Sequence, residues 1–158
     1  MSELLEALHG GDDARVSELL AADPELDVFE AAALGRVDRL RELLADDPSN
    51  ANAVGDDGFH PLGLAAFYGH VEATRLLLEQ GADPNKLSSN ERIEAGALHS
   101  AAAAEKNDQT RYELCELLLE SGADPNLRQG SGETALDTAR QLGDNRLEEL
   151  LLASGASN

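Results

Sequence analysis

One ten-residue phrase occurs twice in this chain. Residues 76–85 read LLLEQGADPN and residues 117–126 read LLLESGADPN, so nine of ten positions are identical across a separation of 41 residues (117 − 76). A related phrase, LLLASGASN, covers residues 150–158, and its Gly155 follows Gly122 by 33 residues (155 − 122). Self-similarity at such spacings indicates a repeat architecture, in which each unit packs against its neighbours.

An alanine-rich segment precedes each copy of the phrase. These segments read PLGLAAFYGH (61–70), ALHSAAAAEK (97–106) and TALDTARQLGD (134–144). The apolar positions of the leucine-rich segment fit one helical face. Each unit is therefore predicted to be a short helix, a turn, a second helix and a loop, and alanine pairs keep the first helix thin enough for neighbouring units to stack closely.

A glycine follows each leucine-rich segment, at Gly81, Gly122 and Gly155. A left-handed residue ends a helix at this place, and glycine adopts that conformation without steric cost. The Asp-Pro pairs at 83–84 and 124–125 then turn the chain away from the helix. We expect the asparagine after each pair to hydrogen-bond the backbone of the turn.

The segment DDGFHPLGLAAFYGHVEATRLLLEQGADPN (56–85) resembles the ankyrin repeat, whose pattern is D-x-x-G-x-T-P-L-H-x-A-A-x-x-G-H, a leucine-rich helix and G-A-D-x-N. The unit ending at Asn126 is similar to this pattern, and Glu133 to Asn158 matches it in part. Residues 29–52 resemble a divergent repeat, and residues 2–28 resemble an N-terminal capping repeat.

This resemblance implies a fold and its division into units. The fold it implies is all-α, an ankyrin-repeat solenoid of about five stacked helix-turn-helix units with short hairpin-like loops. A single domain would cover residues 1–158. Its expected units are 1–28 (the N-terminal cap), 29–55, 56–88, 89–129 and 130–158 (the C-terminal cap).

The chain departs from the family pattern in two ways. His60 and Gly96 stand where the family has threonine, and only His99 keeps the family's histidine, so we expect an incomplete hydrogen-bond network between repeats. The unit from Lys86 to Asn126 is also eight residues longer than the 33-residue period (41 − 33). The extra residues fall in insertions at 86–96 and 105–110.

The charge of the chain limits its partners. It carries 31 acidic and 12 basic residues, a formal net charge of −19. Such a surface repels phosphate backbones and anionic lipid headgroups, so we expect no nucleic-acid and no membrane partner. A protein partner with basic edges fits it, although the acidity could serve solubility alone. With no apolar stretch long enough for a signal peptide or a membrane span, the expected location is cytoplasmic.

The sequence offers no catalytic constellation, such as G-x-S-x-G or a phosphate-binding glycine loop. Cys115 lies among leucines and acidic residues and is predicted to be a buried, unreactive side chain. The histidines share no metal-ligand spacing and are predicted to be structural: His9, His60, His70 and His99. We therefore expect no enzymatic activity, no catalytic residue, no cofactor and no metal.

The resemblance implies a concave binding face formed by the hairpin tips and the outer positions of the first helices. Position by position, it selects Asp56, Asp57, Phe59, Phe67, Tyr68, Arg92, Ile93, Ala103, Ala104, Glu133 and Gln141. Aromatic residues are enriched in binding hot spots, which favours the group of Phe59, Phe67 and Tyr68. Alternatively, the two phenylalanines pack against the long loop of the next unit. Tyr68 is expected to be exposed, since its hydroxyl requires water or a partner.

The predicted function is a non-enzymatic, monomeric protein–protein interaction module that binds a partner on its concave face. One alternative is a small regulator or immunity-type inhibitor of a single basic target protein. Another is an enzyme or metal site built on the insertions at 86–96 and 105–110, which only their unusual length suggests.

The charge generates a prediction about stability. Because self-repulsion at −19 opposes compaction, the melting temperature should rise as sodium chloride increases from a low level to about 0.5 M. Thermal unfolding followed by circular dichroism measures it. A flat or falling curve would mean that the charges are already well paired in the folded state.

Overall fold

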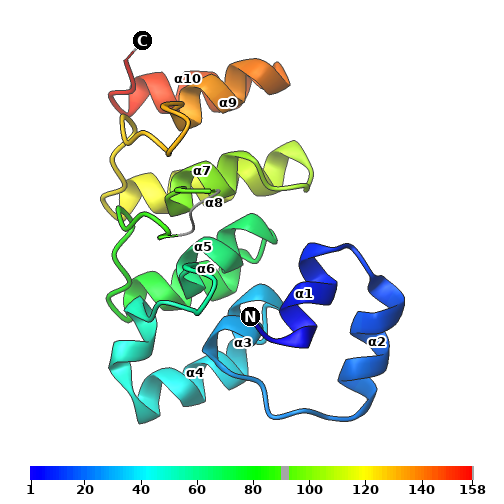
Figure 1. Cartoon of the computed structure of the whole chain (residues 1–158). Helices are drawn as coiled ribbons and strands as arrows, with labels where there is room; N and C mark the ends of the chain where they lie inside the picture. Colours follow the sequence, from blue (N-terminus) through cyan, green and yellow to red (C-terminus); the bar gives the residue numbers. More distant parts are fainter. Residues whose placement is uncertain (90–92, 158) are drawn as a thin grey trace.

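The computed structural model describes residues 1–89 and 93–157, which form five pairs of α-helices and one short 3₁₀ helix. The pairs are piled one on another from α3 and α4 to α9 and α10 (Figure 1). The helices are α1 (Glu3–His9), α2 (Asp13–Ala21), α3 (Val28–Ala33), α4 (Val37–Asp46), η1 (Pro48–Asn52), α5 (Pro61–Phe67), α6 (Val71–Glu79), α7 (Ala97–Ala102), α8 (Asp108–Glu120), α9 (Ala135–Leu142) and α10 (Asn145–Ala153).

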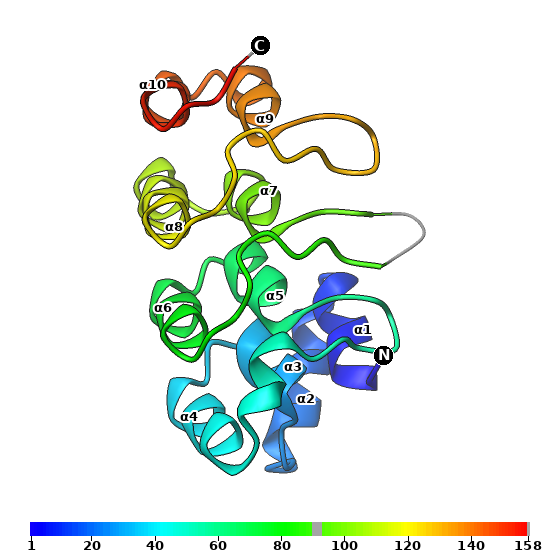
Figure 2. The same cartoon turned by 90° about the vertical axis from the view of Figure 1, so that its left-hand side faces the viewer.

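Two rows of helices make up the stack. Helices α3, α5, α7 and α9 form one row, and α4, α6, α8 and α10 form the other (Figure 2). The loops between units project beyond the first row, on one side of the stack, which is the side where the resemblance places the binding face. One continuous core runs through both rows, from Val28 to Ala156. The predicted all-α solenoid is confirmed.

Alanine and leucine fill this core in different places. The alanine pairs of the first row are fully buried, with no exposed surface: Ala31, Ala32, Ala65, Ala66, Ala101 and Ala102. Their small side chains let successive helices of this row approach closely. Leucines from the second row are at most 1% exposed and fill the space between the rows: Leu40, Leu44, Leu77, Leu114, Leu118, Leu147 and Leu151.

The helix ends follow the local sequence. Gly81, Gly122 and Gly155 have φ angles of 87°, 95° and 99°, which confirms the predicted left-handed residue after each leucine-rich helix. Thr134 caps α9, and its backbone N–H donates to Asp137 Oδ2 at 2.8 Å in a capping box. These signals are local, so the sequence alone was sufficient to predict them.

A ladder of asparagine side chains connects successive loops. Asn85 donates from Nδ2 to the carbonyl oxygen of Gly122 at 2.9 Å, and its Oδ1 accepts from the backbone N–H of Asp124 at 2.7 Å. The same pair of bonds joins Asn52 to Gly81 and Asp83, and Asn126 to Gly155 and Ser157. The asparagines do bond turn backbone, as expected, but the turn belongs to the next unit.

The insertions lengthen elements of the repeat that surrounds them. Helix α8 has 13 residues, whereas the equivalent α6 has 9, so the insertion at 105–110 adds about one turn of helix (13 − 9 = 4). In the described part of the 86–96 insertion, the backbone N–H of Ser88 donates to Ala95 at 3.1 Å. Ser89 then bonds the preceding loop at Gly58, and Glu94 bonds the following loop at Gly130.

The first helix pair does not continue the stack. Helices α1 and α2 lie beside α3, with α1 on the side of the projecting loops (Figures 1 and 2). Leu5 of α1 packs with Ala33 and Leu64 in a small cluster separate from the main core. No residue of α2 is buried. The resemblance implied that residues 1–28 form an N-terminal capping unit of the stack, but it did not indicate that α1 would lie on the side of the projecting loops.

The asparagine ladder generates a prediction about stability. Asn85→Ala removes both bonds to the next loop and should lower the free energy of unfolding by about 1–2 kcal/mol. Urea unfolding measures the change. Asn145→Ala is the matched control, since Asn145 is exposed at the start of α10 and its side chain makes no hydrogen bond among the described residues. Equal effects of the two substitutions would contradict a linking role for Asn85.

Candidate functional site

Four rings meet beside α5, and we call this group the aromatic patch: His9, Phe59, Phe67 and Tyr68. Phe59 precedes α5, Phe67 is its last residue and Tyr68 is its C-cap, whereas His9 ends α1. The Phe67 and Tyr68 rings meet edge to face with centroids 5.2 Å apart. His9 stacks on Phe59 at 5.7 Å and meets Tyr68 edge to face at 5.8 Å.

An apolar hollow of about 80 Å³ opens beside the patch. It is lined by His9, Phe59, Gly63, Leu64, Phe67, Ile93, Ala95 and Ser100. Phe67 is 40% exposed and Ile93 is 52% exposed, so two large apolar side chains face solvent at the rim of one hollow. Exposed apolar groups gathered around a concavity are typical of a surface that a partner covers.

The structure corrects the expected exposure of Tyr68. Its side chain is half-buried, and within residues 1–89 and 93–157 its buried hydroxyl oxygen has no hydrogen-bond partner. Burial raises the pKa of Tyr68 to about 12. The repeat pattern predicted exposure because it describes only one unit. Helix α1, which brings His9 onto Tyr68, lies outside that unit.

Phe59 and Phe67 differ in how deeply they are packed. Phe59 is half-buried against the small cluster of Leu5, Ala33 and Leu64, and its backbone N–H donates to Asp57 Oδ1 at 3.0 Å. Phe67 keeps more exposed surface and shares its hollow with Ala95 and Ile93 of the long loop. Phe67 thus lies near the loop of the next unit, as the alternative predicted. Phe59 instead packs on the side of the N-terminal helix α1.

The predicted acidic residues occupy two separate places. Asp56 and Asp57 line a depression of about 350 Å³ together with Asp27. Glu133 instead accepts a hydrogen bond from Gln141 Nε2 at 2.8 Å. This bond is the main reason why the pKa of Glu133 is lowered, with further bonds from the side chains of neighbouring residues. Glu133 and Gln141 are therefore engaged with each other on the last repeat.

The remaining predicted residues lie in different environments. Ala103 is exposed at the end of α7, whereas Ala104 is only 2% exposed. Arg92 lies outside the described residues. The structure thus gathers Phe59, Phe67, Tyr68 and Ile93, with Asp56 and Asp57 on the neighbouring depression. It adds His9, which the sequence did not associate with this face because nothing local links α1 to α5.

His60 and His70 bind backbone carbonyl groups, in the structural roles predicted for them. The His60 ring places Nδ1 3.0 Å from the carbonyl oxygen of Ala53 and Nε2 2.8 Å from that of Leu87, which bridges two neighbouring loops. His60 thereby connects the units at a position where we expected the network to be incomplete. His70 Nε2 lies 2.9 Å from the Ala33 carbonyl oxygen, and burial lowers the pKa of His70.

The thiol and the possible metal ligands show no reactive arrangement. Cys115 is fully buried, as predicted, and burial raises its pKa to about 12. Within the described ranges, no three side chains of His, Cys, Asp or Glu are grouped so that they could hold a metal ion. In the same ranges, no helix is both long enough and apolar enough to span a bilayer.

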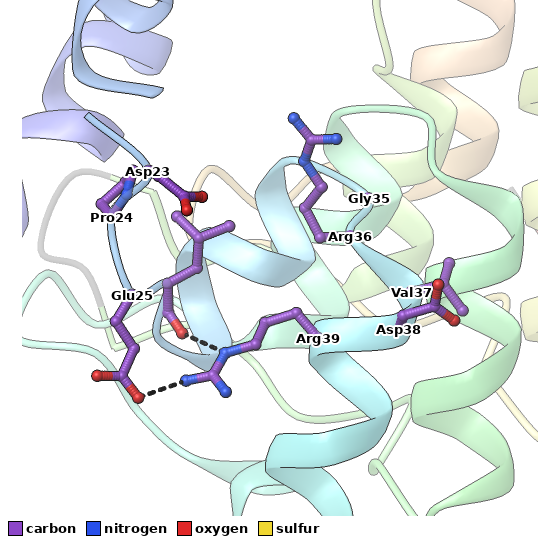
Figure 3. A pocket seen from close by; sticks show the side chains of 9 residues that line it. Asp23, Pro24, Glu25, Gly35, Arg36, Val37, Asp38 and Arg39 are labelled. Carbon is purple, nitrogen blue, oxygen red and sulfur yellow. Dashed lines mark hydrogen bonds and ion pairs between the residues drawn. The ribbon is translucent and has the colours of Figure 1, made fainter. Parts of the chain in front are cut away.

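A wider depression of about 750 Å³ lies where the connection from α2 to α3 faces α4. Figure 3 shows that both charge signs line it. Arg39 donates to the Leu26 carbonyl oxygen at 3.0 Å and to Glu25 at 3.2 Å. These bonds attach the connection to the stack. The depression has mixed charge and holds a paired arginine, so it resembles a joint between segments more than a ligand site.

Known proteins similar to this chain contain ankyrin repeats. A family model described as ankyrin repeats (3 copies) matches residues 2–88 and 28–129. Ankyrin repeat and SAM domain-containing protein 6 of Mus musculus is 35% identical over 130 residues, which is 81% of this chain and 14% of that protein. DNA-binding protein RFXANK of Homo sapiens is 40% identical over 85 residues (54% and 32%). E3 ubiquitin-protein ligase XB3 of Oryza sativa subsp. japonica is 36% identical over 94 residues (58% and 20%). The chain spans less than a third of the length of each of these relatives.

The environment of Tyr68 generates a prediction for Tyr68→Phe. Removing a buried, unpaired hydroxyl should leave stability unchanged or raise it by up to about 1 kcal/mol. Because the pKa rises from 10.0 in the unfolded chain to about 12 in the fold, the wild type should lose stability as the pH rises from 10 to 12. Urea unfolding at pH 7 and across this range measures both effects.

Tyr112→Phe is the control for this test, since Arg146 lies over the Tyr112 ring at 3.8 Å and the substitution keeps that ring. The loss of stability in alkali should be smaller in Tyr68→Phe than in wild type and Tyr112→Phe. A clear destabilisation of Tyr68→Phe at pH 7 would contradict the unpaired hydroxyl.

Proposed function

The chain belongs to the ankyrin-repeat family, whose repeats are generally protein–protein interaction modules, and we propose that it binds a partner protein through its aromatic patch. The observation that carries this proposal is the pair of exposed apolar side chains, Phe67 and Ile93, beside an apolar hollow. An apolar side chain of the partner would fill the hollow and shield Phe67 and Ile93 from water. Anchors of this kind dominate binding energy at protein interfaces.

The charge around the patch defines the partner further. Asp56 is exposed, and Asp57 and Asp27 line the same depression, so basic groups of the partner would meet carboxylates there. The net charge of −19 attracts such a partner over longer distances and speeds its association, an effect that salt reduces. Although one relative is named a DNA-binding protein, a charge of this sign opposes direct contact with a phosphate backbone.

We also propose that the chain acts without catalysis and as a monomer. Its thiol is buried with a raised pKa, and His60 and His70 are engaged with backbone carbonyl groups. Such groups are poor nucleophiles or bases. The relative named an E3 ubiquitin-protein ligase is matched over 20% of its length, so that activity is not carried over to this chain.

The experiment is affinity capture from a lysate of the source cells, with the retained proteins quantified by mass spectrometry. The wild type is compared with Phe67→Ser/Ile93→Ser, which removes both apolar rims of the hollow. A partner retained by the wild type should fall at least tenfold with this variant, since each apolar anchor contributes about 1–2 kcal/mol or more.

Leu142→Ser/Leu152→Ser is the matched control. Leu142 is 53% exposed and Leu152 is 43% exposed, so this variant removes the same kind of surface from the last repeat. Both double variants must show the circular dichroism and the melting transition of the folded protein. A partner that is lost from the control and kept by the patch variant would move the site to the last repeat and overturn the proposal.

A further inference from the structure

The first helix pair occupies a position that the other pairs do not. Successive pairs pack first row on first row and second row on second row, from α3 and α4 to α9 and α10. Helix α2 packs mainly on α1 and does not lie on α4. Helix α1 lies instead on the side of the projecting loops, where its Leu5 packs in one cluster with Ala33 of α3 and Leu64 of α5. Helix α1 therefore lies on the face that we propose for binding, and α2 is attached to it through α1.

Helix α1 covers this face in the manner of a bound helix. Leu5 is 3% exposed, and Leu8 packs on the same cluster, which includes Phe29, Phe59 and Tyr68 at its edge. His9 completes the contact by stacking on Phe59. Positions i, i+3 and i+4 of one helix thus contact one apolar surface, which is the spacing by which helices dock into apolar grooves. We call this surface, formed by Phe29, Ala33, Phe59, Leu64 and Tyr68, the groove under α1.

The contacts that hold the pair in place are few. Helices of seven and nine residues are too short to be stable alone, so α1 and α2 depend on this docking. The apolar cluster under α1 is separate from the main core, and no residue of α2 is buried. The hydroxyl of Tyr68 is buried without a partner among the described residues, which further weakens the contact. Segments held in this way open before the rest of a protein unfolds.

Charge also weakens the docking of the pair. Residues 3–21 contain five acidic residues and one arginine, a formal charge of −4 (1 − 5), and the rest of the chain carries −15 (−19 + 4). The N-terminal end of α1 adjoins the depression lined by Asp27, Asp56 and Asp57. An acidic helix pair thus lies on an acidic body, whereas a basic helix in the same groove would gain from these carboxylates.

We propose that the groove under α1 receives a basic amphipathic helix of the partner, and that α1 is a built-in competitor for it. This inference rests on the proposed function and names its partner segment more closely. The incoming helix carries leucines with the spacing of Leu5 and Leu8, and lysine or arginine on its outer face. When it binds, α1 leaves the groove and α2 moves with it, and the incoming helix packs on Phe59, Leu64 and Tyr68 in place of α1.

The test uses a labelled synthetic peptide with the sequence of residues 2–11 in which Glu3 and Glu6 are replaced by lysine. Its affinity for the full chain is measured by fluorescence anisotropy. Leu5→Ser in the protein should release α1 and tighten binding of the peptide at least tenfold, because the competitor is weakened. Leu152→Ser, at the other end of the stack, should leave the affinity unchanged. Circular dichroism of each variant confirms that the stack remains folded.

Two further peptides separate recognition of the groove from simple attraction of charge. The unsubstituted peptide with both glutamates should bind at least tenfold more weakly than the lysine peptide. A lysine peptide whose leucines are replaced by serine should not bind. If that peptide binds as well as the leucine-containing one, or if Leu5→Ser does not tighten binding, the proposal is overturned.

Hydrogen exchange of the wild-type protein gives an independent test that needs no variant. Backbone amides of α1 and α2 should exchange together and at least tenfold faster than those of α5 and α7. Equal protection of α1 and α5 would overturn the competitor role.

The outcome is also distinct from that of the capture experiment. Loss of a partner in Phe67→Ser/Ile93→Ser without any peptide binding would sustain the proposed function and remove this inference. The opposite result is also possible: Leu5→Ser tightens binding of the peptide, but no captured partner depends on Phe67 and Ile93. Recognition would then be confined to the groove under α1.

Discussion

The structure depends on one amide side chain per loop that uses both its donor and its acceptor on the loop of the next unit. Asn85 holds the carbonyl of Gly122 and the N–H of Asp124, and Asn52 and Asn126 repeat the arrangement. The left-handed glycine ends the helix and presents its carbonyl to the asparagine of the preceding unit. This link sets the register of neighbouring loops, and with it the line of hairpins that borders the concave face. The ten-residue phrase recurs because both halves of the link must be encoded in each unit.

Sequence reasoning succeeded where the cause of a structure lies within a few residues of it. The φ angle of Gly81, the cap at Thr134 and the burial of Ala65 and Ala66 all follow from neighbouring positions. The position of α1 does not, because it rests on contacts such as Leu5 with Leu64, which are far apart in the chain and form no motif. The packing of α1 also explains why Tyr68 is half-buried, whereas the sequence wrongly predicted that it is exposed. Phe59, Phe67 and Tyr68 were predicted to lie together, but His9 could not have been added without the fold.

Departures from the repeat pattern are compensated by contacts of another kind. His60 stands in place of a threonine, and its ring bridges the carbonyl groups of Ala53 and Leu87. The insertion at 105–110 lengthens α8 and brings Arg111 to 3.6 Å from Asp144, a pair whose side chains are 13% and 7% exposed. Arg146 of α10 lies over the ring of Tyr112, which also belongs to α8, at 3.8 Å. The last two repeats are thus joined partly through charged side chains, which a pattern of apolar positions does not reveal.

The acidity of the chain affects folding and recognition in opposite ways. It opposes compaction, including the packing of the acidic pair α1 and α2 beside the acidic stack. Under the proposal, α1 already covers the groove, so the apparent affinity of a partner equals its intrinsic affinity multiplied by the fraction of molecules in which the groove is open. An acidic or neutral helix meets this reduction in full. A basic helix gains attraction from the same carboxylates that weaken the hold of α1, so its advantage over other helices exceeds what the apolar groove alone would give. Under the proposal, the negative charge that lowers stability also makes the protein select basic partners.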